Sequence, residues 1–149
     1  MRTKKSFVIE RVLLAIRRRL AARDVLELGV ALLVLGLIAL PVALTTGLAH
    51  WSPRTIAEMI PLAVRALFIP ALGEELVFRG VLVPTRGASG RPAVWIAFST
   101  TMFVLWHVVE TSFLPGSAST FLRADFLGLA ALLWVLCAVL RYRSGSIWT

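Results

Sequence analysis

An uncharged apolar run over residues 28–49 restricts the folds open to this chain more than any other feature. As a helix rising about 1.5 Å per residue, this run is long enough to cross a hydrocarbon core of about 30 Å. The run and the basic region before it are both too long for a typical signal peptide, so we expect a retained membrane span. Pro41 is expected to kink this helix.

The composition extends this interpretation to the whole chain. Of its 149 residues, 58% are hydrophobic and 16% are charged, and the mean hydropathy is +0.85. Soluble domains contain about 25% charged residues. Three further apolar segments, residues 56–83, 92–109 and 126–140, are predicted to be helical. The predicted fold class is therefore an all-α polytopic transmembrane helical bundle of about four spans, with an N-terminal interfacial helix.

The N-terminal arm, residues 1–25, is strongly basic. Eight of the sixteen Lys and Arg residues lie within residues 1–23. Apolar residues recur there at helical spacing (Ile9, Val12, Leu13, Ile16 and Leu20), which predicts an amphipathic helix. We expect this helix to lie on an anionic membrane surface rather than to bind nucleic acid. A simple solvated helix is the alternative.

The basic residues also predict the orientation. With a cytoplasmic N-terminus, twelve Lys and Arg residues lie inside and two, Arg54 and Arg123, lie outside. Cytoplasmic loops of membrane proteins carry an excess of such residues. We therefore expect an integral protein of a bacterial-type cytoplasmic membrane, with its N-terminus in the cytoplasm.

Two adjacent glutamates, Glu74 and Glu75, lie inside the second apolar segment. A charged group at membrane depth costs roughly 2.5 kcal/mol or more, so such residues usually have a function. Neighbouring helical residues diverge, whereas residues four apart share a face. We therefore expect Glu75 to pair with Arg79 and Glu74 to face a cavity as a general base. Alternatively, Glu74 is an interhelical partner of Arg65.

The third apolar segment contains His107, followed one turn later by Glu110. A short loop over residues 84–91 joins this segment to the glutamate helix, so we expect His107 to approach Glu74. Glu110 either orients His107 or begins a polar exit from the membrane. A glutamate and a histidine in an intramembrane cavity indicate an activated water, by general base or with a metal, and hence a hydrolase.

Two other reactive residues are predicted to have no part in this chemistry. The lone Cys137 cannot form an internal disulfide and lies in an apolar run, so we interpret it as a packing residue. His50 precedes the glutamates and lies near the opposite interface, so we interpret it as an interfacial residue.

The pattern Glu74-Glu75-x-x-x-Arg79 followed by Phe103-x-x-x-His107 resembles the first two motifs of the CPBP family. This family contains the CAAX-processing and bacteriocin-processing membrane proteases. Residues 143–148 resemble the segment that precedes the third motif of the family. The resemblance covers about residues 65–149, and it identifies residues 26–149 as a CPBP-like intramembrane protease domain.

The resemblance implies a reaction and its residues. Glu74 and His107 would hold and activate the hydrolytic water, with a divalent metal such as zinc on His107 and Glu74 if the enzyme uses one. Glu75 and Arg79 would organise the site. The implied substrate is a membrane-associated peptide or lipidated protein, best known as a prenylated CAAX protein, and the implied surroundings are membrane lipids.

The chain departs from the family at its third motif, a second histidine followed four residues later by Asn or another polar residue. No Asn occurs in the chain, and only Thr149 follows Trp148. We therefore expect a C-terminally incomplete domain, with the missing histidine shortly after Thr149; a degenerate, inactive member is the alternative. A non-catalytic immunity or interaction protein is the rival function, and a small transporter is disfavoured by the histidine motif.

Overall fold

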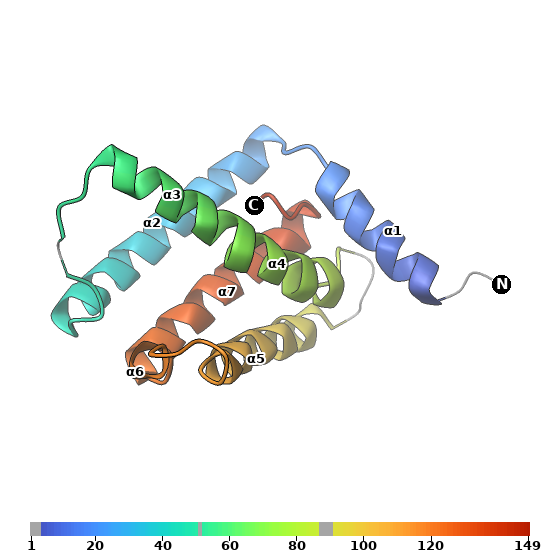
Figure 1. The fold of residues 1–149 in the computed structure, drawn as a ribbon. Coiled ribbons are helices and arrows are strands. Elements are labelled where there is room, and N and C mark those ends of the chain that lie inside the picture. The colour runs from blue at the N-terminus through green and yellow to red at the C-terminus, as the bar shows by residue number, and fades with distance from the viewer. Residues whose placement is uncertain (1–3, 51, 87–90) are drawn as a thin grey trace.

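The computed structural model describes residues 4–50, 52–86 and 91–149, and within these ranges it contains helices and no strand (Figure 1). Three of the described helices are long and apolar enough to cross a membrane: α2 (Ala22–Thr45), α5 (Pro92–Glu110) and α7 (Ala124–Ser144). The predicted class, an all-α membrane helical protein, is confirmed. Residues 1–3 of the predicted arm and 87–90 of the predicted loop lie outside the described residues.

The predicted second span is a continuous helical segment of mixed geometry. It consists of α3 (Ile56–Ala66), η1 (Leu67–Ala71), α4 (Leu72–Glu74) and η2 (Glu75–Leu82), where the η segments are π-helical. A π-helix bonds each amide to the carbonyl five residues back and is found chiefly as short insertions, often at functional sites. Pro70 lies in η1 and has no amide hydrogen to donate, which favours a change of helical geometry there. The sequence predicts a helix here, and the structure adds the change to π-helical geometry in η1 and η2.

The core lies where α7 meets α5 and the end of η2. Its buried residues are apolar and come from all three parts of the chain: Val83, Phe103, Ala130, Trp134 and Ala138. The Phe103 and Trp134 rings stack with their centroids 4.1 Å apart. By contrast, no residue of α2 is buried, although this helix lies against α7. The apolar side chains of α2 are therefore available to lipid.

The N-terminal helix α1 (Lys4–Arg17) packs against η2 and the C-terminal segment. A side chain placed at Gly80 would meet a methyl group of Val12 at 3.5 Å, so the two helices approach closely there. Ala15 is buried, and its carbonyl accepts a hydrogen bond from the Ile147 amide. The sequence predicts an amphipathic helix here, and the structure adds that the helix contacts the rest of the chain. Its position on a membrane surface stays a prediction.

Candidate functional site

Three side chains that can bind a metal converge between α4 and the end of α5. Glu74 is the last residue of α4, His107 lies in the last turn of α5, and Glu110 ends α5. Each offers one ligand atom, and the three atoms lie within 4.8 Å of one another. All three residues are half-buried. The structure thus brings Glu74 and His107 together and adds Glu110 to them.

Contacts between α5 and η2 fix the relative position of the two helices and so bring these residues together. Ser99, Phe103 and His107 are spaced four apart and share one face of α5. The Ser99 hydroxyl donates a hydrogen bond of 3.1 Å to the Phe78 carbonyl on η2. One turn further along α5, the Phe103 and Phe78 rings meet edge to face at 5.8 Å. Since Glu74 lies four residues before Phe78, the next turn of both helices places it near His107.

The imidazole of His107 is held in one orientation. Its Nδ1 lies 2.9 Å from the Phe103 carbonyl oxygen, and because a carbonyl only accepts, Nδ1 carries the hydrogen. In the neutral ring the lone pair is then on Nε2. Three aromatic rings surround the imidazole, with centroids at 4.6 Å for Phe103, 5.5 Å for Phe121 and 5.4 Å for Phe126. This arrangement fixes both the tautomer and the plane of the ring.

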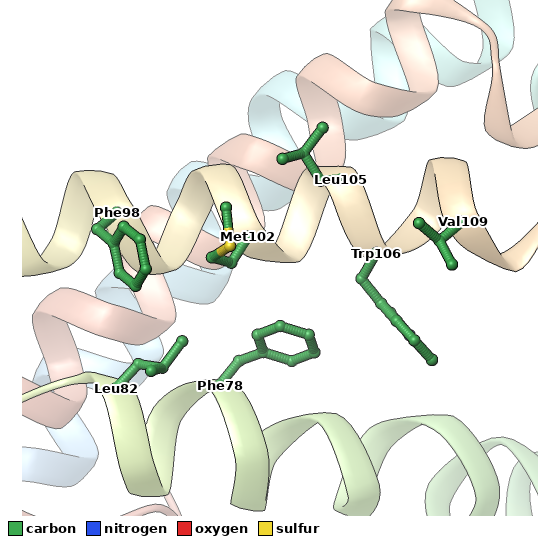
Figure 2. A pocket seen from close by; sticks show the side chains of 7 residues that line it. All are labelled: Phe78, Leu82, Phe98, Met102, Leu105, Trp106 and Val109. Carbon is green, nitrogen blue, oxygen red and sulfur yellow. The ribbon is translucent and has the colours of Figure 1, made fainter.

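An apolar pocket of about 370 Å³ lies between η2 and α5 (Figure 2). Its lining residues are all apolar or aromatic: Phe78, Leu82, Phe98, Met102, Leu105, Trp106 and Val109. The pocket follows α5 from Phe98 to Val109, so one end lies at the turn that carries His107. A hydrophobic group bound there would therefore lie beside the polar cluster.

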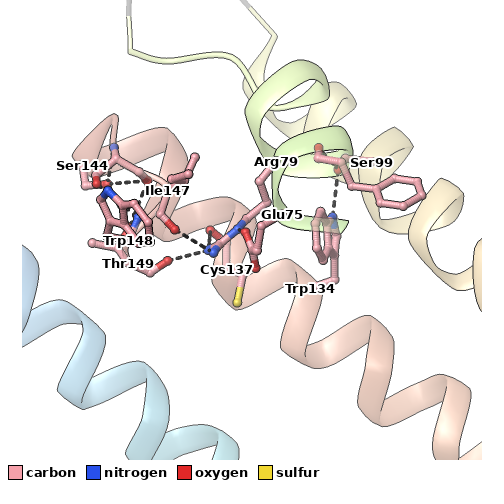
Figure 3. A network of polar contacts seen from close by, with 11 residues as sticks. Glu75, Arg79, Ser99, Trp134, Cys137, Ser144, Ile147, Trp148 and Thr149 are labelled. Carbon is pink, nitrogen blue, oxygen red and sulfur yellow. Dashed lines mark hydrogen bonds and ion pairs between the residues drawn. The ribbon is translucent and has the colours of Figure 1, made fainter. Parts of the chain in front are cut away.

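The second glutamate has a different partner. Glu75 forms an ion pair with Arg79, whose side chain is buried, as the four-residue spacing predicts (Figure 3). The Arg79 guanidinium also donates hydrogen bonds to the carbonyl oxygens of Cys137, Ile147 and Thr149. A buried arginine is stable only when such partners satisfy it. Arg79 therefore ties η2 to α7 and to the C-terminal segment.

A sequence model of the Rce1-like family of type II CAAX prenyl endopeptidases matches residues 53–149. The chain belongs to this family. Comparison with curated proteins and with solved structures gives no match. The matched region of this Rce1-like protein contains the cluster of Glu74, His107 and Glu110 and also the Glu75–Arg79 pair. The resemblance to the CPBP proteases is confirmed, and the family to which the chain belongs is one of CAAX prenyl endopeptidases.

The other residues that the sequence analysis considered lie outside the cluster of Glu74, His107 and Glu110. Arg65 is exposed at the end of α3, and among the described residues no ion pair joins it to Glu74. His50 is exposed between α2 and α3. Cys137 is a free thiol within α7, and its backbone carbonyl accepts a hydrogen bond from Arg79. The alternative pairing of Glu74 with Arg65 is therefore not found.

The sequence places Glu110 beside His107 but does not predict it as a third donor of the cluster, and it makes no prediction for Ser99. Glu110 follows His107 by three residues, a spacing that places both on one helical face and is the signal for it. Ser99 has a weaker signal, a hydroxyl two turns before His107 in an apolar helix. Its partner Trp134, whose indole N–H donates to the Ser99 hydroxyl at 2.8 Å, lies far away in sequence.

Proposed function

We propose that this Rce1-like protein is an intramembrane endopeptidase that hydrolyses a peptide bond in a membrane-associated substrate of the prenylated CAAX type. Glu74 and His107 activate the water in this proposal. The observation that supports it most is the convergence of a carboxylate and an imidazole, from two helices of the matched region, with ligand atoms within 4.8 Å.

The reaction needs a base for the water and a proton donor for the leaving amine. Glu74 accepts a proton from the water as the water oxygen attacks the scissile carbonyl carbon. His107 holds the same water through Nε2, because its Nδ1 hydrogen is engaged by the Phe103 carbonyl. The protonated Glu74 then returns its proton to the amine nitrogen as the carbon–nitrogen bond breaks. Such acid–base catalysis contributes about 10²- to 10⁴-fold in rate.

The donor set also fits a divalent metal. Zinc in catalytic sites is held by imidazole nitrogen and carboxylate oxygen, and His107 and Glu74 supply one of each within the observed distance. We therefore propose His107 and Glu74 as ligands and zinc as the candidate metal. When bound, such a metal lowers the pKa of a coordinated water and polarises a carbonyl.

Glu75 and Arg79 organise the site rather than carry the reaction. Their ion pair holds the helical turn that follows Glu74, and Arg79 fixes that turn to the C-terminal segment. The apolar pocket between η2 and α5 offers room for the hydrophobic group of the substrate beside His107. A substrate with both a peptide bond and a lipid is the one that uses both features.

The surroundings follow from the same proposal. The protein lies in a bacterial-type cytoplasmic membrane with a cytoplasmic N-terminus, because the basic residues gather on that side. Residues 1–25 form its basic arm and residues 26–149 its protease domain. Membrane lipids and a lipidated protein or peptide are its partners.

Substitution of Glu74 by glutamine tests the proposal. The purified protein is reconstituted in liposomes, and cleavage of a farnesylated C-terminal peptide is followed by release of its last residues. Because glutamine keeps the shape but is no base, Glu74→Gln is expected to lower turnover at least about 10²-fold. Glu58→Gln is the matched control. Glu58 is exposed and caps α3 through Thr55, and glutamine retains the capping oxygen.

Equal turnover by Glu74→Gln and wild type would remove Glu74 from the mechanism. A phenotype in cells that survives both Glu74→Gln and His107→Ala would instead favour a non-catalytic immunity or interaction protein.

A further inference from the structure

We infer that Glu110 is the third protein donor of a divalent-cation site that it forms with Glu74 and His107. This inference rests on the proposed function, since the cation would lie where Glu74 and His107 hold the water. Its basis is geometric: one ligand atom from each of the three residues lies within 4.8 Å of the others, and all three are half-buried. Glu110 is thus added to His107 and Glu74, the two ligands proposed above.

The charges of the cluster call for a cation. Glu74 and Glu110 place two carboxylates close together, and Glu110 ends α5, where the helix dipole disfavours negative charge. Among the described residues, no lysine or arginine forms an ion pair with either carboxylate. A divalent cation between the carboxylates would offset both charges and the unfavourable end of the helix.

The contacts of His107 point the same way. Metal-binding histidines usually donate their second ring hydrogen to a carbonyl or carboxylate, which fixes the tautomer. His107 makes this contact from Nδ1 to the Phe103 carbonyl at 2.9 Å. The neutral ring then has no hydrogen on Nε2 to donate to Glu110. A role for Glu110 as the hydrogen-bond partner that orients a neutral His107 is therefore disfavoured, and a shared cation accounts for the proximity of the two side chains.

The ligand set indicates the class of cation. One imidazole and two carboxylates form the His and Glu donor set of catalytic zinc sites, and they also suit manganese and ferrous iron. Three protein donors leave a fourth position for water. The site is thus an open divalent-cation site of the catalytic type rather than a closed structural one.

Metal binding by the purified full chain in detergent tests this inference. Zinc binding is measured by titration calorimetry, and Co²⁺ serves as a probe whose visible absorption reports its ligands. Wild type is expected to bind one equivalent, and Glu110→Gln is expected to bind at least about tenfold more weakly. Glu110→His restores a donor, so it is expected to bind again with an altered Co²⁺ spectrum. Glu58→Gln is expected to bind like wild type, and circular dichroism checks that each variant is folded.

Two outcomes would overturn the inference: wild type without a stoichiometric cation, or Glu110→Gln with the affinity of wild type. The cleavage assay separates this failure from failure of the proposed function. If Glu74→Gln abolishes cleavage while Glu110→Gln binds zinc normally, the proposed peptidase function is supported and the assignment of Glu110 as a ligand is refuted. If substitution of Glu74, His107 or Glu110 abolishes cation binding but wild type cleaves no lipidated peptide, the cation site is supported and the proposed substrate is refuted.

Discussion

Removal of the Ser99 hydroxyl tests how α5 and η2 are held in the register that brings His107 to Glu74. The hydroxyl is fully buried and donates a hydrogen bond of 3.1 Å to the Phe78 carbonyl. It also accepts a hydrogen bond of 2.8 Å from the Trp134 indole (Figure 3). It therefore joins α5, η2 and α7 at one point. Ser99→Ala removes both hydrogen bonds and leaves a buried N–H without its acceptor.

The expected cost follows from those two bonds. Hydrogen bonds between membrane helices average about 0.6 kcal/mol and reach about 1.7 kcal/mol. Two such bonds give about 1.2–3.4 kcal/mol, and the unsatisfied Trp134 N–H favours the upper half of that range. We expect Ser99→Ala to lower the free energy of unfolding by about 2–3 kcal/mol. Cleavage should also fall, because the register of Glu74 and His107 depends on the same contact.

The assay is reversible unfolding in mixed micelles, followed by circular dichroism so that Trp134 is not the reporter. Thr101→Ala is the matched control, since Thr101 is exposed on the same helix and bonds only within it. Trp134→Phe completes a double-mutant cycle with Ser99→Ala. A loss below about 0.5 kcal/mol, within the range of surface substitutions, together with additive effects in the cycle, would refute this account of the register.

Two further substitutions test the segments around the site. Arg79→Lys should lower the thermal unfolding midpoint strongly, because lysine cannot contact Glu75 and several carbonyls at once. Breaking a buried ion pair costs about 3–5 kcal/mol. An unchanged midpoint would show that the Arg79 network is dispensable. Gly145→Ala should destabilise the protein by about 1 kcal/mol, since Gly145 ends α7 with φ of 76°. Gly128→Ala, within α7 and facing open space, should be neutral or stabilising, and equal effects of the two glycine substitutions would contradict this reasoning.

The contacts that the sequence predicts correctly are those set by the spacing of residues along the chain. The Glu75–Arg79 pair follows from positions four apart on a helix, and it forms. The approach of His107 to Glu74 follows from a short loop between two consecutive helices, and the structure brings them within ligand distance. Both predictions need only the helical repeat and the chain connection, which neighbouring residues determine.

The contacts that the sequence does not predict join segments far apart in the chain. The carbonyls that accept from Arg79 lie 58 to 70 residues away, and no pattern of side chains encodes which backbone oxygens meet a guanidinium. The docking of α1 is similar, since its amphipathic pattern fits a membrane surface and a protein surface equally well. The π-helical geometry of η1 and η2 also has no periodic signal, because it changes the repeat itself.

The two adjacent glutamates show how one helical segment can serve two tasks. Glu75 and Arg79 face α7 and the C-terminal segment, where charge is satisfied by carbonyls. Glu74 and Phe78 face α5, where Phe78 packs on Phe103. Phe78 also meets Trp134 of α7 edge to face at 5.9 Å, but it contacts aromatic rings, whereas Arg79 contacts Glu75 and backbone carbonyls. Phe78→Leu should therefore disturb the approach to His107 while the Arg79 network stays intact. Substitutions of Phe78 and of Arg79 thus test two different kinds of contact, aromatic packing and hydrogen bonding, around the same pair of glutamates.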